Sequence, residues 1–509
     1  MDPVVLFSFV IGYFVLLLVV AYFTSRNSNN DSFFIGNKKS NWMLVAFGMI
    51  GTSLSGVTFV SVPGTVGLAA FAYGQVVIGY LIGYMIIAFV LLPLYYRLNL
   101  TSIYDYLKQR FGMVSYKTGA LFFIISRTLG ATARLFLVIN VLHLFILREM
   151  GVPFEVTTFV ILLMIILYTF EGGVKTIVFT DTLQTTFMLI GLVVCIFYIM
   201  NNLDMSFGST MAALDERGLT KIFNSEPGSS SYFLKHILGG VFITVGMTGL
   251  DQEMMQKNIS VKNLKDSQKN MMTFTVIMVV VNFLFLFLGG LLYLFAATKG
   301  INVAADDLFP TIALSYMPTV MSVIFIIGLI SALFPSADGA LTALTSSFCI
   351  DMLGLKRRMD WSEKKRRTIR LTVHFTFAFI FFLMVIGFKL IDNKSIIDVI
   401  LKVAGFTYGP LLGLFSFGIL TRRQINDRLS IVVCLLAPTI ILGIDFINNI
   451  QWYEAQLKLE GDFVQNVKSL STSIFGNFKI GYELLIYNGI LTFLGLLAIS
   501  KKPESVKTD

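Results

Sequence analysis

The residues best suited to chemistry form a polar interruption in a long apolar stretch, between Met49 and Gly64. The interruption reads Gly51-Thr52-Ser53-Leu54-Ser55-Gly56-Val57-Thr58. Hydrocarbon cannot hydrogen-bond to peptide groups, so irregular backbone at membrane depth persists only where it lines a cavity or is buried in protein. Glycines loosen a helix, and the freed carbonyls and the hydroxyls are hard oxygen ligands. The segment therefore indicates either an ion or solute site or a packing kink made by small residues.

A second polar group lies near the start of another apolar stretch, residues 176–200. Asp181 is one to two helical turns into this stretch, beside Thr180, Thr182 and Gln184. A carboxylate among hydroxyls favours a cation site or an exit path for a cation. The alternative is an acid at a helix end that reaches cytoplasmic water.

A third candidate is the segment Ser331-Ala332-Leu333-Phe334-Pro335-Ser336-Ala337-Asp338-Gly339. Ala332 and Ser336 are four residues apart and share a helix face. Pro335 has no N–H, so the carbonyl of Ser331 loses its helical partner and becomes available as a ligand. A proline kink explains the proline but not the nearby Asp338, and the cluster is a second candidate for cation coordination.

Two arginines, Arg127 and Arg134, lie seven residues apart and therefore on one helix face. We expect Arg127, near the cytoplasmic end, to extend its head group toward water. Arg134 sits about halfway through its stretch, where a guanidinium needs a carboxylate, carbonyls or an anionic ligand. A structural partner acid is the alternative. Asp398 and Lys402, spaced i, i+4, are expected to neutralise each other.

The elements that must hold these groups are membrane helices. The chain has 509 residues, of which 56% are hydrophobic and 14% charged, which is too apolar for a soluble protein of this size. Its first apolar run lacks a basic segment and a cleavage site, so it is a span and not a signal peptide. The thirteen predicted spans are 4–24, 42–69, 74–96, 119–147, 153–171, 176–200, 233–256, 271–297, 311–351, 369–390, 396–420, 429–449 and 480–500. The span 311–351 is longer than one crossing needs, so a tilt, a kink or a helical entry from the loop is expected.

The connecting segments alternate in basic content, and basic loops stay cytoplasmic. One side holds most of the Lys and Arg, among them Arg26, Lys38, Lys39, Lys175, Lys257 and Lys507. This predicts an N-terminus outside, a cytoplasmic C-terminus and a multi-pass protein of the cell inner (plasma) membrane. The net charge of +9 then needs no nucleic-acid partner. The three cysteines lie in apolar runs, and neither a disulfide framework nor a metal motif is present.

Several motifs, taken in order, resemble the sodium/solute symporter family, the group with the bacterial proline, galactose and sialic acid symporters. The most specific is Gly172-Gly-Val-Lys-Thr-Ile-Val-Phe-Thr-Asp181-Thr-Leu-Gln184. The others are Asp251-Gln-Glu-Met-Met-Gln-Lys after the seventh span and Gly405-Phe-Thr-Tyr-Gly-Pro410-Leu-Leu-Gly413 in the eleventh. The resemblance runs from about residue 4 to 420.

The resemblance implies an all-α membrane protein of the LeuT type, with two inverted five-helix repeats, one extra N-terminal helix and two C-terminal helices. The first helix of each repeat is expected to be broken, at Gly51–Gly56 and at Gly239-Gly240/Gly246. The predicted parts are listed here: 1–40, N-terminal helix and loop; 41–232, first repeat and external loop; 233–428, second repeat; 429–500, two C-terminal helices; 501–509, tail.

The resemblance also implies site residues. Sodium ligands map to Gly51 and Leu54, then Ala332, Pro335 and Ser336, with proline where family members have a hydroxyl. A second cation, or a proton, is implied at Asp181 and Asp338. Substrate positions map to Ser53, Ser55 and Thr58, and Arg134 resembles the arginine that holds the substrate carboxylate in sialic acid symporters.

The resulting prediction is a sodium-coupled symporter that imports a small organic solute, favouring a carboxylate such as a sialic acid, by alternating access. The partners are a small-molecule solute and the lipid bilayer, and the oligomeric state is left open. A chemical reaction is not expected, because no nucleophile–base pair or phosphate-binding loop is present. The alternatives are a sodium/sugar or sodium/amino-acid symporter, a proton-coupled symporter, and a solute sensor built on a transporter fold.

Overall fold

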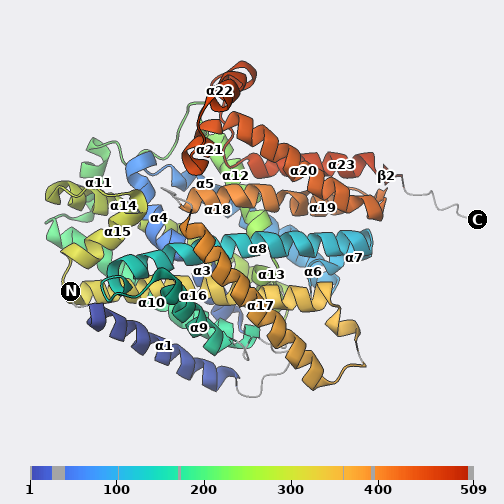
Figure 1. The fold of residues 1–509 in the computed structure, drawn as a ribbon, viewed down its shortest axis with the longest axis horizontal. Coiled ribbons are helices and arrows are strands. Elements are labelled where there is room, and N and C mark those ends of the chain that lie inside the picture. The colour runs from blue at the N-terminus through green and yellow to red at the C-terminus, as the bar shows by residue number, and fades with distance from the viewer. Residues whose placement is uncertain are drawn as a thin grey trace, which may run out of the picture.

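The secondary structure of the chain is almost entirely helical (Figure 1). The computed structural model describes residues 3–25, 40–100, 102–169, 173–358, 360–390 and 396–502. The basic residues Arg26, Lys38, Lys39 and Lys507, and the first residue of the Gly172–Gln184 motif, lie outside the described residues. One antiparallel strand pair, β1 (Gln424–Ile425) with β2 (Ser500–Lys501), joins two distant parts of the chain.

The helices divide into two groups at the long loop after residue 216. The first group is α1 (Pro3–Ser25), α3 (Trp42–Ser53), α4 (Gly56–Ala69), α5 (Tyr73–Ile86), η2 (Ile87–Leu91), α6 (Leu92–Arg97), α7 (Asp105–Arg110), α8 (Met113–Leu142), η3 (His143–Leu147), α9 (Phe154–Thr169), α10 (Gly173–Asn202) and α11 (Phe207–Glu216). The second group is α12 (Phe233–Thr244), η4 (Val245–Gly249), α13 (Gln252–Ile259), α14 (Leu264–Lys299), α15 (Ala305–Thr311), η5 (Ile312–Tyr316), α16 (Thr319–Ser347), η6 (Phe348–Met352), η7 (Leu355–Arg357), α17 (Glu363–Lys389), α18 (Ile396–Thr407), α19 (Gly409–Leu420), α20 (Asp427–Asn448), α21 (Ile450–Leu457), α22 (Asp462–Phe475) and α23 (Leu484–Ala498).

The long helices have the length and polarity of membrane spans. Within the described residues, eight helices are long and apolar enough to cross a membrane, and three bent pairs meet the same test together. Two shorter apolar helices, α9 and α23, lie at the other two positions where spans were predicted. On the long spans, the side chains of Phe89, Phe197 and Phe379 are 60%, 61% and 61% exposed. Exposed aromatic side chains of this kind are suited to contact with lipid hydrocarbon and not with water.

The long span predicted at 311–351 consists of three pieces. A short entry made of α15 and η5 precedes α16, and the chain changes direction at Met317 and Pro318. Of the alternatives considered for this stretch, the structure therefore has the helical entry from the loop.

The first broken helix is found where the sequence predicts it. The chain bends by 55° between α3 and α4, and the break falls at Leu54 and Ser55. The backbone N–H of Leu54 still donates to the Ile50 carbonyl, which closes the last turn of α3. The carbonyls of this last turn have no helical donors beyond the break, because the next residues leave the helix.

The second break lies later than predicted. The bend of 65° separates the continuous run of α12 and η4 from α13, and it falls at Leu250 and Asp251. The Asp251 side chain accepts from the N–H groups of Glu253 and Met254, so it caps α13. The predicted position was wrong because Gly240 serves close packing against α5 and does not break its helix. A third bend of 45°, between α18 and α19, was not predicted.

The two predicted halves of the chain pack into one core. The first half of the broken span, α3, packs against α10, α14 and α16, and α16 also packs against α8. In Figure 1, α3, α8 and α16 lie in the middle of the molecule, with α1 along one edge and α20 to α23 along the opposite edge. The core therefore surrounds the first break with helices from both predicted repeats.

We predict that Gly240→Ala destabilises the fold. A Cβ atom at Gly240 would lie 2.4 Å from the Val76 carbonyl oxygen of α5, and such overpacking costs about 1–3 kcal/mol. The thermal unfolding midpoint of the purified protein in detergent should fall by several degrees. Gly443→Ala is the matched control, because a Cβ atom there meets nothing within 4 Å. Equal midpoints for the two variants would contradict the prediction.

Candidate functional site

The first break lies against α10 and α16. A Cβ atom added to Gly51 would lie 2.4 Å from Thr185 Oγ1 on α10 and 3.5 Å from Pro335 Cγ on α16, so glycine is required for this approach. All of the residues predicted as sodium ligands are buried: Gly51, Leu54, Ala332, Pro335 and Ser336. The structure thus brings the end of α3 to the proline segment of α16.

The side-chain oxygens at this contact are uncharged. Thr185 Oγ1 is buried without a hydrogen-bond partner. Ser336 Oγ donates to the Leu333 carbonyl over 2.8 Å, which leaves its lone pairs to coordinate an ion. Uncharged oxygens at a broken helix suit a hard monovalent cation such as sodium. Among the described residues, no group of three or more His, Cys, Asp or Glu could hold a metal ion.

A cavity opens beside the break. All four residues predicted to contact substrate line it: Ser53, Ser55, Thr58 and Arg134. Other lining residues supply hydroxyl, amide and phenol groups: Thr244, Thr248, Asn282, Tyr73, Tyr80 and Tyr84. The unfilled space in and in front of it, counting its open mouth, is about 710 Å³.

Arg134 is half-buried on the wall of this cavity. It forms no ion pair with any acidic residue that the structure describes. The alternative in which Arg134 pairs with an acid of the protein is therefore not found among those residues. The guanidinium of Arg134, which has five N–H donors, instead lines a cavity whose wall also carries hydroxyl groups.

Arg127 does not reach cytoplasmic water, and that prediction was wrong. Its side chain is 4% exposed, pairs with Glu253, and lies 4.0 Å from Asp251. Tyr408 donates to the same oxygen of Asp251, Oδ2, over 2.7 Å. A buried cation needs an acidic partner, and the acids at the start of α13 lie in the core. The side chain of Arg127 therefore lies beside these acids and not in cytoplasmic water.

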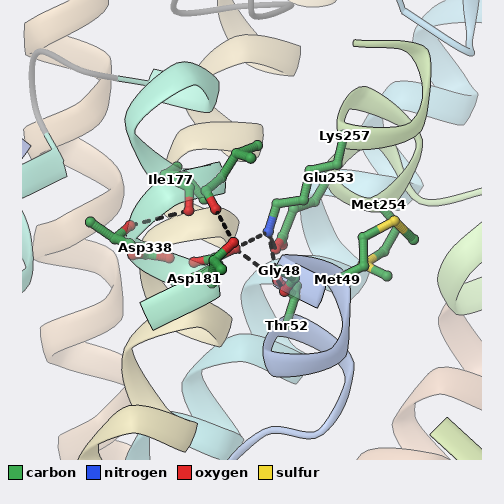
Figure 2. Close-up of polar contacts among 12 residues, drawn as sticks. Gly48, Met49, Thr52, Ile177, Asp181, Glu253, Met254, Lys257 and Asp338 are labelled. Carbon is green, nitrogen blue, oxygen red and sulfur yellow. Dashed lines mark hydrogen bonds and ion pairs between the residues drawn. The ribbon is translucent and has the colours of Figure 1, made fainter. Parts of the chain in front are cut away.

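Lys257 is buried as well, although the alternation of basic connecting segments along the chain predicted that it lies in a cytoplasmic loop. Figure 2 shows it reaching from α13 toward Asp181 and Thr52. Its Nζ lies 2.7 Å from Asp181 Oδ2, 2.6 Å from Thr52 Oγ1 and 3.6 Å from Glu253 Oε1. Thr52 Oγ1 in turn donates to Asp181 Oδ2 over 3.1 Å. An ammonium of the protein thus occupies one oxygen of Asp181.

The residues predicted for a second cation or a proton, Asp181 and Asp338, are both fully buried. Asp338 Oδ2 accepts a hydrogen bond from Tyr168 over 2.8 Å. The remaining oxygens, Asp181 Oδ1 and Asp338 Oδ1, have no hydrogen-bond partner. The second cation or proton at these two acids stays a prediction.

Asp398 and Lys402 do not neutralise each other through an ion pair, and that prediction was wrong. Lys402 Nζ lies 2.8 Å from Asp445 of α20, and Asp398 accepts from Tyr482 over 2.8 Å. Lys402 prefers the buried acid of a neighbouring helix, while Asp398 is exposed.

Sequence reasoning missed Thr185, Glu253 and Lys257 as site residues. The last two were visible in the Asp251–Lys257 motif, which was assigned to a segment after the seventh span. The i, i+4 spacing places Glu253 and Lys257 on one helix face, but it does not distinguish a buried pair from an exposed one. Thr185 follows the Asp181 motif by one residue, and only the packing of α10 against Gly51 identifies it.

Comparisons with known proteins agree with this architecture. A family model described as the sodium:solute symporter family matches residues 33–428, more than half of the chain. Among the solved structures that match, one of a substrate-bound, outward-open Na⁺-coupled sialic acid symporter has a TM-score of 0.80. The match covers 98% of this chain and 99% of that chain at 17% identity, so the two share a fold.

Similar curated proteins are also named as sodium-coupled carriers. The sodium/sialic acid symporter NanT of Aliivibrio fischeri is 24% identical over 440 residues, covering 84% of this chain and 85% of NanT. The sodium/sialic acid symporter SiaT of Proteus mirabilis is 22% identical over 472 residues, covering 88% of this chain and 90% of SiaT. The sodium-coupled monocarboxylate transporter 1 of Mus musculus is 25% identical over 430 residues, covering 79% of this chain and 66% of that protein.

We predict that Arg127→Gln destabilises the protein by about 3 kcal/mol, because buried Glu253 loses its closest cation and keeps only Lys257 at 3.6 Å. The thermal unfolding midpoint reports the loss, and the double variant Arg127→Gln/Glu253→Gln should recover part of it. Lys389→Gln is the control, since it removes an exposed ion pair with Glu155 at 3.5 Å that contributes little. A single variant as stable as the double variant would contradict the proposed dependence of Glu253 on Arg127.

Proposed function

The chain belongs to the sodium:solute symporter family, and we propose that the solute it carries with sodium is an organic carboxylate of the sialic acid kind. The family makes the protein a sodium-coupled symporter of a small solute, embedded in the membrane through many helices. It is a transporter and not an enzyme, as the sequence predicts. The LeuT-type fold and sodium as the coupling ion were also predicted correctly.

The observation that carries the carboxylate proposal is the unpaired Arg134 on the cavity wall. A half-buried guanidinium without an acidic partner is costly unless a ligand supplies the anion. Arginine grips a carboxylate through two parallel hydrogen bonds, which fixes both the position and the orientation of the solute. The solute therefore binds with its carboxylate toward α8, where Arg134 is located.

The rest of the lining favours a hydroxylated ring. Ser53, Ser55 and Thr58 contribute hydroxyl groups to the lining, and the tyrosines of α5 contribute aromatic rings and phenols. A ring with hydroxyl substituents can stack on the aromatic faces and donate or accept hydrogen bonds at its edge. Two similar proteins are named for sialic acid and one for monocarboxylates, which supports a sugar acid.

For the coupling ion we assign the carbonyls of Gly51 and Leu54, with Ala332, Pro335 and Ser336 on α16. Pro335 stands where the family has a hydroxyl, so this shell lacks one oxygen. Thr185 supports the assignment, because its unpartnered hydroxyl meets Gly51 from α10. Thr185 Oγ1 replaces the missing hydroxyl from a different helix.

The proposed cycle follows from these positions. Sodium joins α3 of the predicted first repeat to α16 of the second and stabilises the outward-open state. The solute then binds between the break and Arg134, and the rocking of the repeats opens the inner side, where sodium concentration is low. We place the N-terminus outside and the C-terminus in the cytoplasm of a plasma membrane, as the basic loops favour.

One observation favours a second candidate, proton coupling. Asp181 Oδ1 and Asp338 Oδ1 are buried without hydrogen-bond partners, and a proton bound to either acid would relieve their repulsion. This version predicts accumulation driven by a pH gradient in sodium-free buffer.

We predict that Thr185→Val and Ser336→Ala each raise, severalfold, the sodium concentration for half-maximal uptake into proteoliposomes, because each removes a sodium ligand. Thr186→Val is the control, since the Thr186 hydroxyl is exposed and donates to the carbonyl of Thr182. Unchanged sodium dependence would remove the residue concerned from the shell. Uptake driven by a pH gradient alone would favour the proton candidate.

We predict that Arg134→Gln weakens sialic acid binding at least about tenfold, as expected for the loss of a charge-assisted hydrogen bond. Isothermal titration with sialic acid and its methyl ester measures this loss, and the wild type should prefer the free acid. A sodium-induced thermal shift in the variant serves as the control for an intact fold. Equal affinity of the wild type for acid and ester would reject the carboxylate proposal.

A further inference from the structure

A second cavity lies apart from the solute cavity, between the ends of α6 and α19 and beside α7. Its walls combine apolar and basic side chains from four elements, among them Val90 of η2, Leu94 and Arg97 of α6, Arg110 of α7 and Ile419 of α19. The volume of this α6–α19 cavity is about 420 Å³, and none of its lining residues lines the solute cavity. No described residue that lines it is acidic. The cavity therefore carries positive charge that belongs to neither of the proposed transport sites.

Backbone carbonyls hold Arg110 in place without neutralising it. Arg110 Nε donates to the Gly418 carbonyl over 3.2 Å, and Nη2 donates to the carbonyls of Thr421 and Arg423 over 2.8 Å each. A carbonyl carries no full charge, so the guanidinium keeps its net positive charge. Its Nη1 group makes no hydrogen bond to the residues that the structure describes. Arg110 is thus a fixed cation with donors left for an anion.

Arg97 brings a second positive charge to the same cavity. It is the last residue of α6, and its side chain is exposed. Neither Arg97 nor Arg110 forms an ion pair with an acidic residue in the described part of the chain. Two guanidinium groups beside one cavity repel each other unless an anion lies between them. A phosphate group suits this place, because arginine binds phosphate through parallel charge-assisted hydrogen bonds.

The apolar and basic residues of the cavity follow the order of a lipid molecule. Val90, Leu94 and Arg97 are spaced i, i+4 and i+7, so they share one helix face. Arg97 lies about 10 Å further along the helix axis than Val90. On α19, Ile419 comes shortly before the basic segment 422–423. Val90 and Ile419 are 46% and 37% exposed. Both helices therefore change from apolar to basic as they approach the membrane surface.

An anionic phospholipid matches both parts of the cavity. Its phosphate meets the arginines, and an acyl chain covers the apolar wall, which a free phosphate would leave bare. The basic segments around the cavity belong to the side that we assign to the cytoplasm, where anionic lipids attract each nearby arginine by about 1 kcal/mol. A zwitterionic lipid would bring its own ammonium beside the two guanidinium groups, which weakens the attraction.

We propose that the α6–α19 cavity binds an anionic phospholipid, with its phosphate at Arg97 and Arg110 and an acyl chain along Val90 and Ile419. This site goes beyond the transport function, because it takes neither sodium nor the solute. α6 belongs to the first predicted repeat and α19 to the second, so a bound lipid joins the two. A ligand that binds only the folded protein stabilises it, and anionic lipid should therefore raise the thermal unfolding midpoint.

The test measures lipid binding by native mass spectrometry of the purified protein in a neutral detergent. Phosphatidylglycerol and phosphatidylcholine with identical acyl chains are added to the wild type, Arg97→Gln and Arg428→Gln. The wild type should bind phosphatidylglycerol about fivefold more tightly than Arg97→Gln does, as expected for the loss of one arginine contact. Phosphatidylcholine should bind equally to all three proteins. Arg428→Gln is the matched control, because Arg428 is exposed and outside the cavity, and its replacement removes the same charge.

Three results would overturn the proposal. One is an equal affinity of the wild type for the two lipids. Another is a phosphatidylglycerol affinity of Arg97→Gln that is no lower than that of Arg428→Gln, since surface charge alone would then explain the binding. The third is displacement of bound phosphatidylglycerol by an equimolar amount of glycerol phosphate, because the cavity would then be a site for a free anion. None of these results bears on the solute proposal, since neither sodium nor sialic acid is present.

Discussion

The architecture depends on the rule that a charge inside hydrocarbon must meet an opposite charge. α13 brings Glu253 and Lys257 into the core just beyond the second break, with Asp251 as its cap. These groups pair with Arg127 of α8 and Asp181 of α10, and Tyr408 donates to the cap. Since an unpaired buried ion costs several kcal/mol, these partners fix where α13 can lie between the helices of the first predicted repeat.

The residues proposed to bind the ion and the solute gather at one turn of α3. Its last turn faces α10 and α16 through Gly51, α13 through Thr52, and the cavity beyond the break through Ser53. The neighbouring groups differ between the three residues: Gly51 lies against uncharged oxygens, Thr52 against a paired ammonium, and Ser53 against a cavity with a guanidinium on its wall. A small movement of this turn would therefore change the proposed ion site and the proposed solute site together, which is what coupled transport needs.

The features that the sequence predicted correctly are local ones. Apolar runs located the helices, and glycines with hydroxyl residues at membrane depth located the first break at Leu54. The misplaced features depend on partners far along the chain. Arg127 looked like a helix-end residue because Glu253 lies 126 positions away. Lys257 followed an apolar run and therefore looked like a loop residue, although a bend of 65° returns it to the core. The residues of the solute cavity were predicted together only through the family resemblance, and their roles remain proposals.

One departure from the family pattern, the proline at position 335, is matched by a residue of a neighbouring helix. Pro335 removes a hydroxyl from α16, and the hydroxyl of Thr185 meets the same glycine from α10. At Asp181 the partner likewise comes from another helix, because Lys257 of α13 provides the positive charge. In both cases a side chain from a neighbouring helix supplies the polar partner. Thr185 and Asp181 both belong to α10 and lie four residues apart on one face of that helix. In the proposed sites, α10 therefore contributes polar groups that α16 alone does not supply.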